Sequence, residues 1–157
     1  MEIRLATLND VEALCPLLNE FYAYNAQLQP VYCKSDDEQG EYPRTIIESE
    51  NSDFLIAVEN GAILGFIHIS QMKTLPYGSI VPHNYAEIIA FMVTASRRGQ
   101  GIGSMLVDAA KQWSNARNLD YIELFSLTNA KEANYFYDKK GFNTVSYIRR
   151  YTLSGTQ

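Results

Sequence analysis

Glycine recurs at alternate positions in the stretch Arg98-Gly99-Gln100-Gly101-Ile102-Gly103, which follows an apolar run at 85 to 94. Apolar residues at helical spacing follow the stretch. Because glycine has no Cβ atom, consecutive backbone N–H groups can converge on a phosphate, and the start of a helix adds about half a positive charge. The pattern of strand, glycine turn and helix therefore predicts a binding site for a pyrophosphate group.

Two common nucleotide-binding motifs do not match this stretch. A Walker P-loop ends in Gly-Lys-Ser/Thr, whereas Gly103 is followed by Ser104 with no lysine before it. A Rossmann fingerprint needs Gly-x-Gly-x-x-Gly, and Ser104 stands where the third glycine would be. No acidic residue lies about 20 positions later at the end of an expected strand, with the exception of Glu123. A third kind of phosphate site must therefore be considered.

The stretch at 98–103 resembles the Arg/Gln-x-x-Gly-x-Gly/Ala hallmark of the GNAT superfamily of N-acetyltransferases. The resemblance extends to Val93 and Leu106 on either side, and to Ala133-Asn134-Tyr135-Phe136-Tyr137-Asp138-Lys139-Lys140-Gly141-Phe142, which is similar to the second coenzyme-binding segment of that family. The opening residues 3–10 look like a GNAT first strand and helix start. The likeness is weakest at 27–42 and 73–84, the loops that would shape the acceptor pocket.

The resemblance implies that the chain uses acetyl-coenzyme A as co-substrate and transfers the acetyl group directly to a primary amine. Backbone N–H groups would bind the pyrophosphate, and the edge of the strand at 85–94 would pair with the pantetheine amides. An N–H of Phe91 or Met92 would stabilise the oxyanion, and Asn129 or Asn134 would contact the pantetheine arm. The coenzyme-binding residues expected on this basis are Phe91, Met92, Val93, Arg98, Gly99, Gln100, Gly101, Ile102, Gly103, Ser104, Asn129 and Asn134.

Two side chains are candidates for proton transfer. A lysine-like amine titrates near 10.4, so freeing its lone pair at pH 7 costs about 4 to 5 kcal/mol. The resemblance assigns the general base to Glu87, which would accept the proton directly or through a water; the alternative is a carboxylate paired with a surface cation. It assigns Tyr137 as the acid that protonates the leaving thiolate; the alternative is packing beside Phe136.

The remaining candidates favour structural roles. His68 alternates with apolar residues on an expected strand, and His83 lies in a loop where it would line the acceptor pocket or simply cover the surface. Cys15 and Cys33 have neither metal-ligand spacing nor a partner base, so we expect no zinc site, no disulfide framework and no acyl-enzyme.

The composition limits the partners. A net charge of -5 argues against a nucleic-acid surface, and no apolar run is long enough to span a membrane. We expect a cytoplasmic protein and allow for a homodimer. The acidic cluster from Asp36 to Glu41 would attract a cationic amine or would be only a solvated loop. The sequence does not distinguish a polyamine, an aminoglycoside, an amino acid, a protein N-terminus and a lysine side chain as the acceptor. The alternative to an enzyme is a non-catalytic domain that senses acyl-coenzyme A.

We expect one domain over residues 1–157 to position the candidate coenzyme-binding and catalytic residues. We expect an α/β (α+β) fold with a mixed, mostly antiparallel sheet of about six to seven strands, about four helices on both faces, and a splay between the strands at 85–94 and 120–127. Asn60-Gly61 predicts a hairpin, Thr7-Leu8-Asn9-Asp10 a capping box at a helix start, and Gly141 a helix C-cap. The expected strands lie at 2–6, 53–59, 62–72, 85–94, 121–127 and 142–153, and the helices after Thr7-Leu8-Asn9-Asp10, at 43–50, after 102, and at 130–140.

Overall fold

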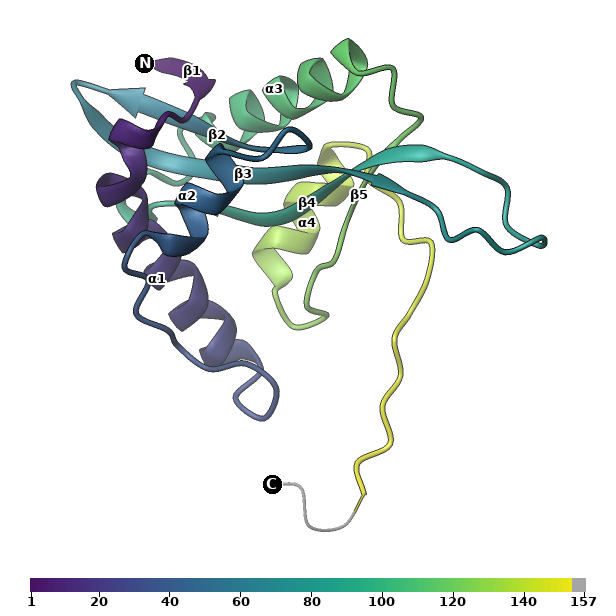
Figure 1. Cartoon of the computed structure of the whole chain (residues 1–157). Helices are drawn as coiled ribbons and strands as arrows, with labels where there is room; N and C mark the ends of the chain where they lie inside the picture. The colour runs from purple at the N-terminus through teal and green to yellow at the C-terminus, as the bar shows by residue number, and fades with distance from the viewer. Residues whose placement is uncertain (154–157) are drawn as a thin grey trace.

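A five-stranded sheet crosses the molecule in the computed structural model, which describes residues 1–153 (Figure 1). The strand order is that of the sequence; the first four strands are antiparallel to their neighbours, and the fifth is parallel to the fourth. The sheet is therefore mixed and mostly antiparallel, as predicted. The strands are β1 (Glu2–Leu5), β2 (Ser52–Glu59), β3 (Ala62–Lys73), β4 (Asn84–Val93) and β5 (Ile122–Leu124).

Helices cover both faces of the sheet. On one face α1 (Val11–Leu28) and α2 (Glu41–Ile47) pack over a core that includes Phe54, Phe66 and Met92. On the other face α3 (Ile102–Ala116) packs over Ile67 and Ile88, and α4 (Lys131–Lys139) adds Phe136 to the same core. Apolar side chains of β2, β3 and β4 contribute to both cores, because successive side chains of a strand point to opposite faces of the sheet.

Local turn chemistry sets several element boundaries. Asn60 and Gly61 have positive φ angles of 52° and 80°, as the predicted β2–β3 hairpin requires. The predicted capping box joins Thr7 and Asp10 ahead of α1, and Gly141 ends α4 with a φ of 84°. These predictions are confirmed.

The β4–β5 pair diverges after a short paired stretch. Pairing runs from Ala86 with Ile122 to Ile88 with Leu124 and goes no further. On the other side of β4 the register with β3 shifts between His68 and Ile69, which leaves Ile89 as an unpaired bulge residue. The predicted splay between these strands is therefore present, and among residues 1–153 no strand pairs with β4 beyond Ile88 on the side of β5.

Two predictions of strand extent were wrong. The sheet has five strands rather than about six to seven, because residues 142–153 form no strand within the described chain, although their apolar alternation favours one. The strand expected at 121–127 is only Ile122–Leu124. Both errors have one cause: a strand needs a neighbour, and β5 has no partner on its outer side among residues 1–153. The helix expected at 43–50 lies at Glu41–Ile47, where Gly40, with a φ of 102°, precedes it.

Candidate active site

The glycine turn joins the end of β4 to the start of α3. Gly99 and Gly101 have φ angles of 74° and 85°, and a Cβ atom added at either position would meet nothing within 4 Å. The backbone N–H groups from Gly99 to Ser104 donate no hydrogen bond within the described residues. They lie at the N-terminus of a 15-residue helix, whose dipole favours an anion. The turn thus presents a row of free donors around open space.

Neighbouring side chains hold this turn in place. Arg97 donates to Glu59 Oε2 at 2.6 Å and to Gln100 Oε1 at 2.9 Å, which ties the turn to the end of the β2–β3 hairpin. Arg98 donates from Nε to the carbonyl of Val93 at 3.0 Å. The guanidinium of Arg98 therefore lies beside the free edge of β4. The side chain of Gln100 accepts a hydrogen bond from Arg97 within the turn.

The first turn of α3 packs tightly on β4 and α4. Ile102 is buried in the core, and Ser104 is half-buried. A Cβ atom on Gly103 would lie 3.3 Å from Cζ of Phe91 and 3.3 Å from Cζ of Phe136. Glycine at 103 therefore lets the helix approach both aromatic rings, whereas Gly99 and Gly101 supply the left-handed backbone of the turn.

The free edge of β4 presents backbone groups to the gap between β4 and β5. Thr94 donates its N–H to Leu64 of β3 at 2.9 Å. Because successive N–H groups of a strand point to opposite sides, the N–H of Met92 also faces β3, and those of Phe91 and Val93 face the gap. The edge available for a ligand amide or an oxyanion is therefore that of Phe91 and Val93.

Tyr137 faces the same gap from α4. Its ring centroid lies 6.3 Å from that of Phe91 and 5.9 Å from that of Phe142. Burial raises the pKa of the Tyr137 phenol to about 12, with a smaller contribution from Tyr24. The phenol is consequently protonated at neutral pH and can act as a hydrogen-bond donor. The fold brings this residue, expected from the sequence, next to the β4 edge.

Both candidate asparagines bond to backbone carbonyls. Asn129 donates from Nδ2 to the carbonyl of Leu28 at the end of α1, at 2.7 Å. Asn134 donates from Nδ2 to the carbonyl of Leu127 at 2.9 Å, within the loop that enters α4. In this structure these amide groups fix the β5–α4 connection on the border of the gap.

A polar row crosses the α1 and α2 face of the sheet next to the gap. Ser52, Ser70, Glu87 and Glu123 occupy paired register positions on β2, β3, β4 and β5. Burial raises the pKa of Glu87, and the charge of Glu123 raises it further. A raised pKa makes a carboxylate a stronger proton acceptor. Glu87 therefore remains the candidate for the general base.

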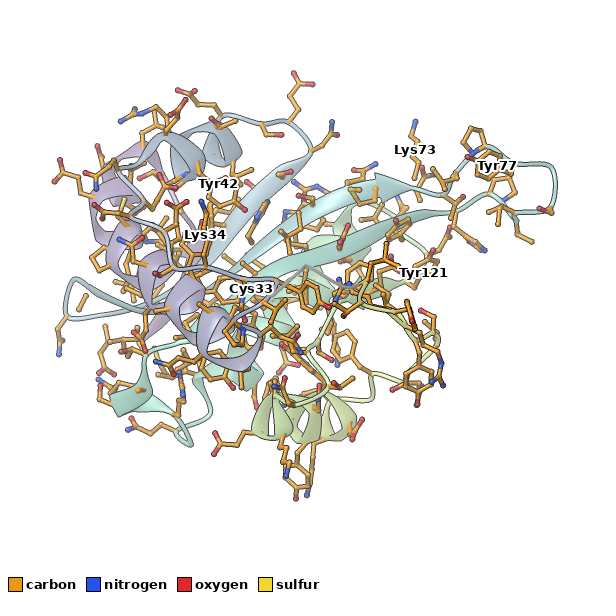
Figure 2. The ribbon with its side chains drawn as sticks, turned by 90° about the horizontal axis from the view of Figure 1, so that it is seen from below. Cys33, Lys34, Tyr42, Lys73, Tyr77 and Tyr121 are labelled. Atoms are coloured by element: carbon orange, nitrogen blue, oxygen red, sulfur yellow. The ribbon has the colours of Figure 1, made fainter. Side chains whose placement is uncertain are left out.

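Two stacked tyrosines border this carboxylate pair. The rings of Tyr85 and Tyr121 lie 4.9 Å apart with an interplanar angle of 13°. Figure 2 shows the face from below, with Tyr121 on the side of the protruding β3–β4 arm and the loop of Cys33 and Lys34 toward α1. This group is absent from the sequence-based predictions. The signal for it is the pattern Tyr-x-Glu, which occurs once at Tyr85 to Glu87 and again at Tyr121 to Glu123.

His68 belongs to a buried hydrogen-bond chain. Its Nδ1 bonds to the hydroxyl of Tyr42 from α2, and its Nε2 bonds to Oγ of Ser70 at 3.2 Å. Ser70 in turn bonds to Oγ of Ser52 at 2.6 Å. Burial lowers the pKa of His68 to about 4, so the ring is neutral at physiological pH. The histidine is hydrogen-bonded at both nitrogens, as the structural interpretation of the sequence expects.

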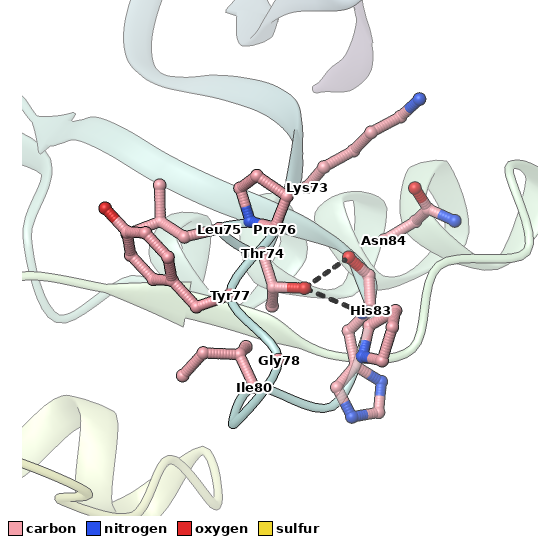
Figure 3. Close-up of a pocket in the computed structure, with 10 residues that line it drawn as sticks. Lys73, Thr74, Leu75, Pro76, Tyr77, Gly78, Ile80, His83 and Asn84 are labelled. Carbon is pink, nitrogen blue, oxygen red and sulfur yellow. Dashed lines mark hydrogen bonds between the residues drawn. The ribbon is translucent and has the colours of Figure 1, made fainter.

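His83 lies on the arm formed by the β3–β4 connection. The ring Nδ1 of His83 lies 2.9 Å from Oδ2 of Asp120. The backbone N–H of His83 donates to Oγ1 of Thr74 at 2.9 Å. Figure 3 shows the second contact inside a hollow lined by residues of the segment 73–84. This hollow lies at the end of β4 opposite the glycine turn, since Asn84 begins the strand and Val93 ends it. We therefore do not assign the hollow to the coenzyme.

The acidic loop has a structural use. Glu38 Oε1 accepts the N–H of Gly40 at 2.8 Å and that of Tyr42 at 3.3 Å, so Glu38 caps the start of α2. Asp36 and Asp37 are exposed. Burial raises the pKa of the Cys15 thiol, whose Sγ donates to the carbonyl of Val11. Within residues 1–153 no cluster of side chains is suited to hold a metal ion, and no helix is long and apolar enough to cross a membrane.

Comparison with known proteins gives a family match. The model of the acetyltransferase (GNAT) family matches residues 12–142. The matched range contains the glycine turn, both Tyr-x-Glu pairs and Tyr137. An uncharacterized N-acetyltransferase of Bacillus subtilis, YhfO, is 24% identical over 156 residues, which cover 98% of this chain and 97% of the relative.

Solved structures share the fold. A tetramutant of the BH1408 protein from Bacillus halodurans is 22% identical and superimposes with a TM-score of 0.91, covering 98% of this chain and 100% of that one. The aminoglycoside N-acetyltransferase AAC(6')-Iy, solved in complex with CoA, is 16% identical with a TM-score of 0.72, covering 97% of this chain and 98% of that one. At these identities the likeness concerns the fold alone.

Proposed function

The chain belongs to the GNAT family of acetyltransferases and is an acyltransferase, and from that premise we propose that it transfers the acetyl group of acetyl-coenzyme A directly to a primary amine. One observation carries the proposal: the free N–H groups from Gly99 to Ser104 continue into the open edge of β4, beside Tyr137. This arrangement offers an anion site, a strand edge and an acid in sequence along one gap. We treat residues 1–157 as one catalytic domain.

The coenzyme would bind along this gap from the glycine turn inward. The N–H groups between Gly99 and Ser104 would take the pyrophosphate, with the guanidinium of Arg98 beside them. The open edge at Phe91 and Val93 would pair with the pantetheine amides, and Asn129 and Asn134 would border the arm. The N–H of Phe91 is the donor we assign to the thioester oxygen, since that of Met92 faces β3.

The reaction would then need an acceptor for the proton of the ammonium group and a donor for the leaving thiolate. Glu87 would accept a proton from the ammonium form of the acceptor, directly or through a water, so that the amine lone pair can attack the thioester carbon. Collapse of the tetrahedral intermediate forms the amide, breaks the C–S bond and releases a second proton from the nitrogen, which would restore the Tyr137 hydroxyl after that group has protonated the thiolate. The thiolate that leaves would take a proton from the Tyr137 hydroxyl, which burial keeps protonated. Neither Cys15 nor Cys33 takes part in this direct transfer.

The acceptor we propose is a primary amine with at least one further positive charge. Glu123 and the stacked rings of Tyr85 and Tyr121 lie beside Glu87, and carboxylates with aromatic faces favour cations. The exposed Asp36 and Asp37 add negative charge in the loop between α1 and α2. Polyamines, aminoglycosides and lysine side chains all meet this description. A non-catalytic acyl-coenzyme-A sensor is the second candidate, and the presence of both Glu87 and Tyr137 favours the enzyme.

We expect acetyl-coenzyme A to raise the thermal midpoint of the protein, whereas NAD and ATP at the same concentration leave it unchanged. A ligand that binds only the native state stabilises it by RT ln(1 + [L]/Kd), about 2.7 kcal/mol at a hundredfold excess over Kd. Differential scanning fluorimetry measures the shift. Equal stabilisation by NAD would return the glycine turn to a dinucleotide-binding interpretation and remove the basis of the proposal.

We expect Glu123→Gln to move the acidic limb of the kcat/KM profile to lower pH. The charge of Glu123 raises the pKa of Glu87, so its removal lowers that pKa, and the deprotonated base is then present at more acidic pH.

Glu87→Gln should lower the rate of acetyl transfer, and part of that rate should return at high pH, where more of the acceptor amine is neutral in solution. Glu48→Gln, an exposed residue after α2, is the control. An unchanged profile in Glu123→Gln would exclude Glu87 as the titrating base.

A further inference from the structure

A chain of buried polar side chains crosses the face of the sheet that α1 and α2 cover. His68 is 2% exposed and Ser70 is 6% exposed, and Tyr42 of α2 and Ser52 of β2 extend the chain at its two ends. Apolar side chains at these positions would avoid the cost of removing polar groups from water. The acetyl transfer proposed above uses none of the four residues. The chain is therefore a candidate for a role at the neighbouring Glu87.

The contacts of His68 indicate which of its ring nitrogens carries the proton. Burial raises the pKa of Tyr42 well above that of a free tyrosine, so this phenol is protonated. Among residues 1–153 the hydroxyl of Tyr42 has Nδ1 of His68 as its only hydrogen-bond partner, and it therefore donates to Nδ1. A neutral imidazole carries one proton. That proton is consequently on Nε2, which donates to Oγ of Ser70 at 3.2 Å.

The hydroxyl of Ser70 lies between side chains of two neighbouring strands. Its Oγ lies 2.6 Å from Oγ of Ser52 on β2, and on its other side Ser70 is paired with Glu87 of β4. Residues paired in this way have Cβ atoms about 5 Å apart, a distance that a glutamate side chain can span. A hydroxyl oxygen has two lone pairs and one proton. Ser70 can thus accept from His68 and from Ser52 and give its own proton to Glu87.

The charge of Glu87 decides where the proton of Ser70 points. A hydrogen bond to a carboxylate is roughly twice as strong as one between neutral groups. Ser52 offers Ser70 only a neutral oxygen, and it can keep its contact with Ser70 by acting as the donor. The carboxylate is therefore the better acceptor whenever Glu87 is ionised.

Other ionisable side chains surround Glu87 without supplying a donor to it. They lie on β3, on β4 itself, on β5 and on the covering helices: His68, Tyr85, Tyr121, Glu123, Tyr22 and Tyr42. Within residues 1–153 no lysine, arginine or histidine forms an ion pair with Glu87. Burial raises the pKa of Glu87, and the charge of Glu123 raises it further. Ser70 is the neighbour placed to act in the opposite direction.

We propose that Ser70 is a positioning residue for the general base: its hydroxyl, held by His68, donates to the ionised carboxylate of Glu87 and orients it. A donor to the ionised form lowers the pKa of a carboxyl group. Ser70 would thus limit the rise that burial and Glu123 cause. The inference rests on the proposed function for the catalytic role of Glu87, whereas the hydrogen bond itself can be measured without catalysis.

A carbon NMR titration of the Glu87 carboxyl group tests the hydrogen bond on the full chain, with Glu87→Gln to assign the signal. We expect Ser70→Ala and Ser70→Val to raise the pKa of Glu87 by about one unit, because the ionised form loses its donor. Ser70→Thr, which has the shape of valine but keeps a hydroxyl, should restore the parent value.

Ser52→Ala is the matched control for these substitutions. It removes a hydroxyl from the same chain, but β2 lies one strand further from Glu87 than β3 does. The pKa of Glu87 should therefore stay at the parent value. An unchanged pKa in the folded Ser70→Ala or Ser70→Val protein, or an equal shift in Ser52→Ala, would overturn the proposal and leave the chain a purely structural network.

The pH profile of kcat/KM connects the hydrogen bond to catalysis. In Ser70→Ala the acidic limb should move to higher pH by the same amount as the pKa measured by NMR, opposite to the direction expected for Glu123→Gln. If the pKa rises and the limb stays in place, Glu87 is not the base, and the positioning role is wrong together with that part of the proposed function. If neither moves, Glu87 keeps its assignment and only the inference about Ser70 is wrong.

Discussion

Replacing Gly101 by aspartate is expected to abolish the binding of acetyl-coenzyme A while the protein stays folded. Gly101 has a φ of 85° and open space around its missing Cβ atom. An aspartate side chain there would occupy the place of phosphate oxygens and would bring a negative charge to a helix N-terminus that should receive an anion. Aspartate tolerates the left-handed conformation better than most residues, so the backbone can keep its shape. Isothermal titration calorimetry with acetyl-coenzyme A measures the loss.

The chain supplies a matched control in Gly61. This glycine has a φ of 80°, and a Cβ atom added to it would meet nothing within 4 Å, but it lies in the β2–β3 hairpin. Gly61→Asp should therefore bind the coenzyme like the parent protein. Gly101→Asn, which adds the same bulk without the charge, should give an intermediate affinity. A folded Gly101→Asp protein with unchanged affinity would remove the glycine turn from the coenzyme site.

Tyr137→Phe should lower kcat by about 100-fold and leave the KM for acetyl-coenzyme A nearly unchanged. The phenylalanine keeps the ring that packs beside Phe91 and Phe142 and removes only the hydroxyl. General acid catalysis is worth about 10²- to 10⁴-fold, and a thiolate is already a good leaving group, so the lower end of that range applies. Steady-state kinetics under conditions where chemistry limits turnover measures the effect.

Tyr135→Phe is the control for this substitution. Tyr135 lies on the same helix and is 64% exposed, so loss of its hydroxyl should change neither kcat nor KM. If Tyr137→Phe retains the full kcat when chemistry is rate-limiting, the hydroxyl is not the acid and the tyrosine serves only the packing of α4.

Elements specified by local chemistry could be predicted from the sequence. The Asn60-Gly61 hairpin, the capping box ahead of α1 and the C-cap at Gly141 each depend on residues close together in the chain, and all are present. The glycine turn at 98–103 is of the same kind, because strand, turn and helix are consecutive. The approach of Tyr137 to the β4 edge could be predicted only through the family resemblance, since no local pattern joins α4 to β4.

Features that depend on non-local pairing could not be predicted in the same way. The alternation in 142–153 is typical of a strand, but whether such a segment becomes one depends on a neighbouring edge that local sequence does not specify. The bulge at Ile89, which helps to decide which N–H groups face the gap, likewise exists only in relation to β3. The proximity of Glu123 to Glu87 follows from the parallel register of β4 and β5. Each of these requires the sheet to be assembled first.

We propose that this chain moves an acetyl group from acetyl-coenzyme A to a cationic primary amine. Mass spectrometry of reactions with acetyl-coenzyme A and a panel of cationic, neutral and acidic amines tests it most directly, with coenzyme A thiol release followed in parallel. We expect N-acetylated product in amounts equal to the thiol released, with the highest kcat/KM for an amine that carries a second positive charge. Binding of acetyl-coenzyme A without acetylated product from any amine would contradict the account and favour the sensor.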